Sequence, residues 1–180
     1  MFHLIFNRYW DICLLKESPE NTSYSISRMV LSGFVLALLI MIEWDVTSFK
    51  SSDDMVSSAL ISIFLILSDV IYTYLVLSFK GFAARLVQVV TSLFVINIII
   101  HILVLPLLLI APYLSQFHLR TPLFLFLGII YLFLSLGLSV WQFVITANIY
   151  KFALNVTMIQ AVLTAFGLVA VNILTVSLLQ

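Results

Sequence analysis

Five long apolar stretches, joined by short polar links, constrain this chain more than any other feature of its sequence. They run over residues 27–44, 56–78, 84–109, 122–149 and 155–179. The hydrocarbon core of a bilayer is about 30 Å thick and a helix rises about 1.5 Å per residue, so each stretch can cross a membrane as a helix. We therefore predict an all-α integral membrane protein with five transmembrane helices.

The composition supports a lipid environment and excludes several partners. The chain is 63% hydrophobic and 9% charged, whereas a soluble domain has about 45–50% apolar and about 25% charged residues. A net charge of zero argues against nucleic-acid binding. A single cysteine, Cys13, cannot form an internal disulfide, and no Cys/His cluster has the spacing of a zinc site. We expect no metal and no cofactor.

Residues 1–17 precede the first span and carry an amphipathic pattern. Apolar residues recur at helical spacing, while His3, Asn7 and Asp11 form a polar stripe at every fourth position. This pattern predicts a short amphipathic helix in the membrane interface, where Tyr9 and Trp10 suit the headgroup level. The alternative is a short helix that packs on the cytoplasmic ends of the bundle, and the sequence does not separate the two. The charged residues in this segment argue against a secretory signal peptide.

The basic residues predict the orientation, because lysine and arginine near the spans are held on the cytoplasmic side. Six of them lie before or at the start of the first span, or in or beside the second and fourth links: Arg8, Lys16, Arg28, Lys80, Arg85 and Lys151. The other two links hold Lys50 and Arg120, and the first of these links also gathers the acidic residues Glu43, Asp45, Asp53 and Asp54. The N-terminus is predicted in the cytoplasm and the C-terminus outside. In a bacterium, the chain would lie in the inner membrane.

Prolines are expected to limit the third helix. Pro106 cannot donate a backbone hydrogen bond, so we expect it to kink the helix or end it. Pro112 and Pro122 are then expected to bracket a loop.

Two ionisable residues, Asp69 and His101, lie deep in predicted spans, where a charge is costly and a functional role is the default reading. Their depths differ by about 12 Å at the helical rise, so we do not expect them to pair directly. Asn97 lies one turn before His101, and these two are expected to share a polar contact. Hydroxyl groups at the level of Asp69 are expected to satisfy its oxygens: Thr91, Ser92, Ser139 and Thr164. Further polar positions in or beside the spans are Gln88, Gln142, Asn148, Gln160 and Asn172.

These polar residues permit two interpretations. In the first, Asp69 is the titrating carboxylate of a proton or cation path that includes Asn97 and His101. In the second, the polar side chains only join helices and fix their register. A transport path usually recruits more than one acid, which favours the second interpretation.

Small residues four positions apart form three candidate packing faces, because they allow two helix backbones to approach closely. The pairs are Gly33 with Ala37, Ser135 with Ser139, and Ala161 with Ala165. Packing within the bundle is one use of such a face, and contact with a partner or a second copy is the other.

Enzyme signatures such as GxSxG, HExxH and a phosphate-binding loop are absent from the sequence. We therefore expect a non-enzymatic multi-pass protein that works by association, as an accessory subunit or scaffold, with a membrane-protein partner or as a homo-oligomer. The alternative is an oligomeric transporter or channel with a polar path through Asp69, Asn97 and His101.

Three strings resemble the Yip1-domain family of five-span membrane proteins. KGFAARLVQ at residues 80–88, followed by LPLLL at 105–109, resembles that family's third helix. The stretch from Trp141 through KFALNVTMIQA is similar to its last two spans, and CLLKESPEN at 13–21 resembles the start of small bacterial members. The resemblance implies a five-helix bundle with a cytoplasmic N-terminus, and it implies no catalytic residue.

Overall fold

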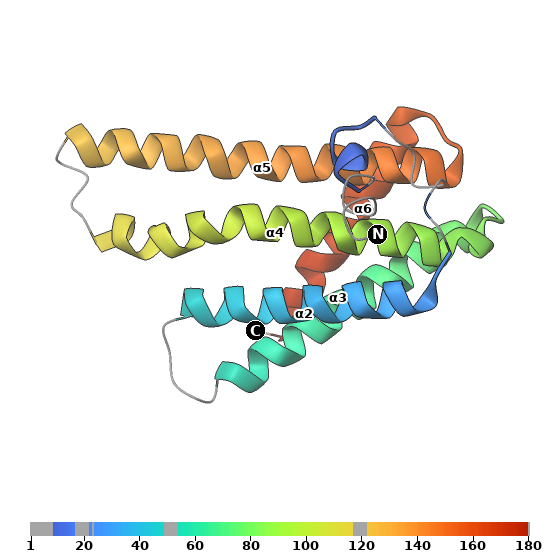
Figure 1. The fold of residues 1–180 in the computed structure, drawn as a ribbon, viewed down its shortest axis with the longest axis horizontal. Helices are drawn as coiled ribbons and strands as arrows, with labels where there is room; N and C mark the ends of the chain where they lie inside the picture. The colour runs from blue at the N-terminus through green and yellow to red at the C-terminus, as the bar shows by residue number, and fades with distance from the viewer. Residues whose placement is uncertain (1–8, 17–21, 23, 49–53, 117–121, 180) are drawn as a thin grey trace.

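The fold is a bundle of long helices (Figure 1), seen in a computed structural model that describes residues 9–16, 22, 24–48, 54–116 and 122–179. The long helices are α2 (Ile26–Ser48), α3 (Asp54–Phe79), α4 (Leu86–Gln116), α5 (Pro122–Leu154) and α6 (Met158–Leu179). A single 3₁₀ turn, η2 (Ala83–Arg85), precedes α4. These five helices are long and apolar enough to cross a membrane. The prediction of an all-α, multi-pass membrane protein is confirmed.

Each helix matches one predicted span, and four of the five end beyond it, whereas α4 and α6 begin two and three residues later than predicted. The largest difference is in α4, which continues through Pro106 and Pro112 to Gln116. Of the two expected effects of Pro106, a kink or the end of the helix, the second is wrong, and so is the expectation that Pro112 borders a loop. In hydrocarbon a backbone that leaves the helix exposes several polar groups, whereas a proline inside it forfeits one hydrogen bond, so continuing the helix costs less. Pro122 occupies the first position of α5, where a missing N–H is not needed.

The five helices pack in a closed ring. α2 contacts α3 and α4, α5 contacts α4 and α6, and α6 contacts α3, so the order around the ring is α2, α3, α6, α5, α4. α3 and α4 also touch each other. Figure 1 shows that α4 and α5 lie side by side and project further than the other helices at one end. Polar groups that face the inside of this ring are thereby removed from lipid.

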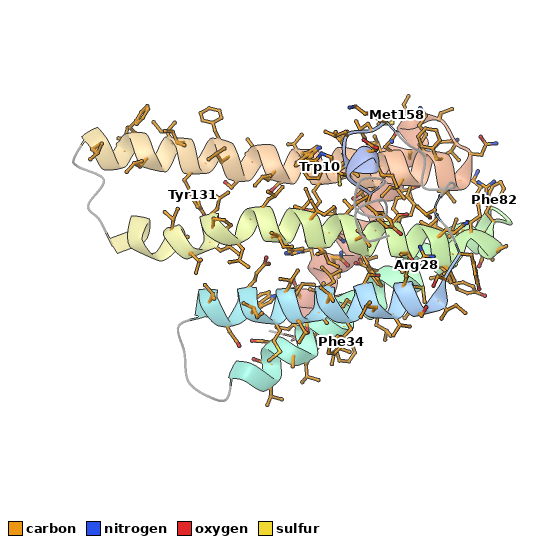
Figure 2. The ribbon with its side chains drawn as sticks, in the orientation of Figure 1. Trp10, Arg28, Phe34, Phe82, Tyr131 and Met158 are labelled. Atoms are coloured by element: carbon orange, nitrogen blue, oxygen red, sulfur yellow. The ribbon has the colours of Figure 1, made fainter. Side chains whose placement is uncertain are left out.

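The ends that carry the basic residues are joined by tight links. Gly81, with φ +77°, turns the chain between α3 and η2, and Asn155, with φ +51°, turns it between α5 and α6. Both are residue types that tolerate the left-handed conformation. Arg85 donates from Nη1 to the carbonyl oxygens of Phe152 and Ala153, 3.4 Å from each, and so caps the end of α5. Arg28, Phe82 and Met158 lie toward this same end (Figure 2).

The best-packed part of the bundle lies toward this basic end. Its largest cluster joins α3, α4, α5 and α6 around fully buried residues such as Leu77, Ile149 and Tyr150. A second cluster joins α2 to α4 through Leu36 and Phe94. Large apolar side chains on the outer faces are exposed, with Leu132, Phe133 and Leu136 on the first half of α5 each more than half exposed. Hydrocarbon is the solvent that such a surface requires.

Residues 9–16 lie against the bundle. Helical backbone covers residues 9–13, and Tyr9, Ile12 and Cys13 are buried in the largest cluster. Trp141 of α5 donates from Nε1 to the carbonyl oxygen of Cys13 at 3.1 Å, and its ring meets that of Trp10 edge to face. Figure 2 shows Trp10 beside α5. His3 and Asn7 of the predicted stripe lie outside the described residues, and a position at the headgroup level stays a prediction.

Candidate functional site

An open cavity of about 650 Å³ is lined by residues from all five helices, some of them exposed, such as Ile173. Most of its wall is aliphatic or aromatic, with Leu36, Trp44, Phe143 and Leu168 among the lining residues. The polar side chains that line it are Glu43, Asp69, Asn97, His101, Ser139, Gln142, Thr146, Asn172 and Ser177. A concave space of this size can hold a small ligand or a group of waters.

Asp69 is the most buried carboxylate of this cavity, with 7% of its surface exposed. Asn172 on α6 donates from Nδ2 to Oδ1 of Asp69 at 2.9 Å. Ser68 donates to Oδ1 of Asn172 at 3.1 Å, which fixes the amide with its nitrogen toward Asp69. Within the described part of the chain, Asn172 is the hydrogen-bond donor that the structure gives to Asp69. The carboxyl group thus meets a neutral donor and the open cavity.

The second acid of the cavity, Glu43, pairs with the histidine. Oε2 of Glu43 on α2 and Nδ1 of His101 on α4 lie 2.7 Å apart. The two side chains are partly buried, with 12% and 25% of their surfaces exposed. The contact requires a proton between the two atoms, so Nδ1 of His101 carries hydrogen when Glu43 is ionised.

A third contact joins α4 to α5. Gln142 donates from Nε2 to Oδ1 of Asn97 at 2.9 Å, and both residues line the cavity. The three contacts therefore tie α2 to α4, α4 to α5 and α3 to α6 around one space.

The cavity is closed toward the basic end of the bundle. Thr73 lies one turn after Asp69 on α3, and Tyr150 lies one turn after Thr146 on α5. Their hydroxyl oxygens are 2.9 Å apart, and both side chains are fully buried. Toward the other end the lining includes Glu43 in the last turns of α2 and Ser177 in the last turn of α6. The cavity thus occupies the half of the bundle away from the basic residues.

The expected hydroxyl partners of Asp69 are wrong. Thr91, Ser92, Ser139 and Thr164 each donate to the carbonyl oxygen four residues earlier in their own helix. A hydroxyl in a helix commonly bonds back in this way because its acceptor is always within reach. Ser139 does line the cavity, but Asn172 donates to Asp69.

The expected contact between Asn97 and His101 is also absent from the bonds that the described residues form. The two side chains line the same cavity, but Asn97 bonds Gln142 and His101 bonds Glu43. Glu43 falls within the first predicted span and was grouped with the acids of the following link. Glu43 and His101 lie at similar distances from the starts of α2 and α4. This similarity in depth is the sequence signal that could have predicted their contact.

Two of the three small-residue pairs lie where helices pack. Ala161 and Ala165 are fully buried in the largest cluster, and a Cβ added to Gly33 on α2 would lie 3.1 Å from the Phe94 ring on α4. Ala37, one turn after Gly33, is half-buried. Ser135 and Ser139 donate to carbonyl oxygens of their own helix, and Ser139 lines the cavity. Gly137, between them in sequence, lies on the opposite side of α5, where an added Cβ would meet no atom within 4 Å. That side of α5 has no packing partner around Gly137 among the described residues.

Metal binding finds no support in the described residues, where no group of three His, Cys, Asp or Glu side chains converges. Comparison of the chain with models of known protein families, with curated proteins and with solved structures gives no match.

Proposed function

We propose that this chain is a solute-binding membrane protein of the transporter or channel class, and that the cavity is its binding site. The observation that carries the proposal is the position of Asp69, which is more than nine-tenths buried and borders a space of about 650 Å³. A polar group that only joins helices is expected to be packed on all sides. Keeping a carboxyl group beside an open space in the membrane costs free energy that a ligand can offset.

Two further observations support the proposal. The cavity gathers two carboxyl groups and a histidine, which meets the expectation that a transport path recruits more than one acid. The buried Thr73–Tyr150 pair lies one turn from the cavity lining on the side of the basic end, and the lining continues toward the other end. A barrier on one side of a binding site is one element of alternating access. No catalytic reaction is part of the proposal.

A flux measurement tests it. Proteoliposomes are loaded with a mixture of small amines, polyols and organic acids, and the retained solutes are measured against empty liposomes. We expect the protein to release at least one solute and Asp69→Asn to reduce that release about tenfold or more, because the variant keeps a polar side chain and loses the charge. Release that is equal with and without the protein contradicts the proposal.

An orientation belongs to the same proposal. Arg28, Lys80, Arg85 and Lys151 lie at or near one end of the helices, and the rule that basic residues stay inside predicts this end in the cytoplasm and the other end, near Glu43 and Ser177, outside. Reporter fusions test it, because a C-terminal alkaline phosphatase is active only outside the cytoplasm. An active fusion supports the orientation, and an inactive but intact one reverses it.

Association with a second copy or another membrane protein is a second candidate function. It is favoured by the open space around Gly137 of α5, and by the resemblance to the Yip1-domain family, whose members are bundles of five spans. Native mass measurement after gentle extraction tests it. A Gly137→Leu variant is expected to convert an oligomer to a monomer, and a wild-type protein that is strictly monomeric and free of other proteins contradicts this candidate.

A further inference from the structure

The cavity carries an imbalance of charge. Its described lining residues include two carboxyl groups, one histidine and no lysine or arginine. A single histidine can balance at most one of two carboxylates. Asp69 accepts its hydrogen bond from a neutral amide, that of Asn172. When both carboxyl groups are ionised, the described lining therefore carries a net negative charge even with His101 protonated.

We propose that the cavity binds a small organic cation with an ammonium group, and that Asp69 is its counter-ion. This rests on the proposed function and names the class of its solute. A desolvated carboxylate is costly without an opposite charge, and a bound ammonium supplies that charge together with hydrogen-bond donors or polarised C–H groups. The cation compensates Asp69 only when bound, so its affinity is tied to this one residue.

The shape and lining of the cavity favour an organic cation over a metal ion. Hard cations such as Ca²⁺ require six or more oxygen ligands at about 2.3–2.6 Å, and the described residues hold no converging group of three acidic, histidine or cysteine side chains. The wall is mostly hydrocarbon, which suits the carbon part of an organic ammonium. Trp44 and Phe143 line the same space, and aromatic faces attract ammonium groups.

The experiment compares ligands that differ in charge alone. Choline and its uncharged isostere 3,3-dimethylbutan-1-ol are titrated calorimetrically into the full-length protein in lipid nanodiscs, with tetraethylammonium as a second, larger cation. We expect a cation to bind and the isostere to bind at least about tenfold more weakly. Equal binding of choline and its isostere overturns the inference and leaves the cavity as a binding site for uncharged solutes. Absence of binding by both cations, with no amine lipid retained, also overturns it.

Two variants test whether Asp69 is the counter-ion of the bound cation. Asp69→Asn is expected to weaken cation binding about tenfold or more. Asp45→Asn is the matched control, because Asp45 lies on α2 outside the lining and accepts a hydrogen bond from Ser58. Equal loss in both variants contradicts a counter-ion at Asp69. Should Asp69→Asn fail to fold, the comparison of choline with its isostere on the wild-type protein still decides the question.

The ammonium group can belong to a free solute or to a lipid headgroup, and the nanodisc lipid separates these sources. Titrations are repeated in phosphatidylglycerol alone and with added phosphatidylethanolamine. Competition by phosphatidylethanolamine assigns the site to a lipid amine, and unchanged choline binding assigns it to a free solute; both support an ammonium site. Solute flux in the proteoliposome assay without any preference for cations would reject the inference while the proposed function stands.

Discussion

Asn172 on α6 donates a hydrogen bond of 2.9 Å to Asp69 on α3, and Ser68 holds the Asn172 amide in the orientation that this bond needs. The contact joins two helices that are 103 residues apart at these positions. It also determines which side of the Asp69 carboxyl group is left for the cavity.

Loss of either partner of this bond is expected to destabilise the bundle. Loss of both partners should cost less than the sum of the two single losses, because each single change already removes the bond. Hydrogen bonds between membrane helices contribute about 0.6 kcal/mol on average and up to about 1.7 kcal/mol. In a double-mutant cycle with Asp69→Ala and Asn172→Ala, thermal or denaturant unfolding in detergent is expected to give a coupling energy in this range. Thr175→Val is the control, because its hydroxyl bonds only Val171 of its own helix. Strictly additive effects of the two alanine changes would show that the bond contributes nothing.

The sequence predicts the spans well and the polar pairs poorly, for one physical reason. The cost of removing polar groups from water is decided residue by residue, so apolar runs mark the helices and isolated charges mark Asp69 and His101. The pairs depend on the rotation and tilt of each helix. α3 and α6 run obliquely to α4 and α5 in Figure 1 and contact each other. Asn172 thereby reaches Asp69, whereas counting depth along upright helices selects Thr164.

Gly167 is expected to be intolerant of a side chain. A Cβ at this position on α6 would overlap the hydroxyl of Tyr72, which donates to the Thr164 carbonyl oxygen at 2.8 Å. Gly167→Ala should therefore lower the free energy of unfolding by about 1–3 kcal/mol. Gly137→Ala is the matched control, since nothing lies within 4 Å of its added Cβ, and it should be neutral or slightly stabilising.

Removal of the Tyr72 hydroxyl should relieve this overlap. In the Gly167→Ala background, Tyr72→Phe is expected to lower the free energy of unfolding by less than it does in the wild-type protein. If Gly167→Ala unfolds at the same denaturant concentration as Gly137→Ala, the close approach of α3 and α6 described here is wrong.

Cys13 is expected to be unreactive in the folded protein. Burial raises the pKa of its thiol to about 11, because the charged thiolate is disfavoured away from water. At pH 8 the thiolate fraction is then about one in a thousand. A water-soluble maleimide should label Cys13 only after denaturation, which mass spectrometry of the intact chain can measure.

The same shift links stability to pH. The folded-state pKa of Cys13 lies above that of the unfolded chain, so the folded protein holds the proton more tightly. The stabilisation that results is complete below about pH 8.5 and is lost as the pH rises toward 11.

Trp141→Phe removes the hydrogen bond to the Cys13 carbonyl and should speed labelling of Cys13 by loosening residues 9–16. Rapid labelling of the native wild-type protein would contradict the packing of this segment.

Access of water to the cavity is the most direct test of the account. Ser139 lines the cavity, whereas its neighbour Val140 is 54% exposed and does not. Each is replaced by cysteine, and a membrane-impermeant methanethiosulfonate is applied from outside to sealed vesicles, with Cys13 present in both. The account predicts labelling of Ser139→Cys and none of Val140→Cys, because one side chain faces an aqueous cavity and the other faces hydrocarbon. An unlabelled Ser139→Cys, or equal labelling of both variants, would contradict it.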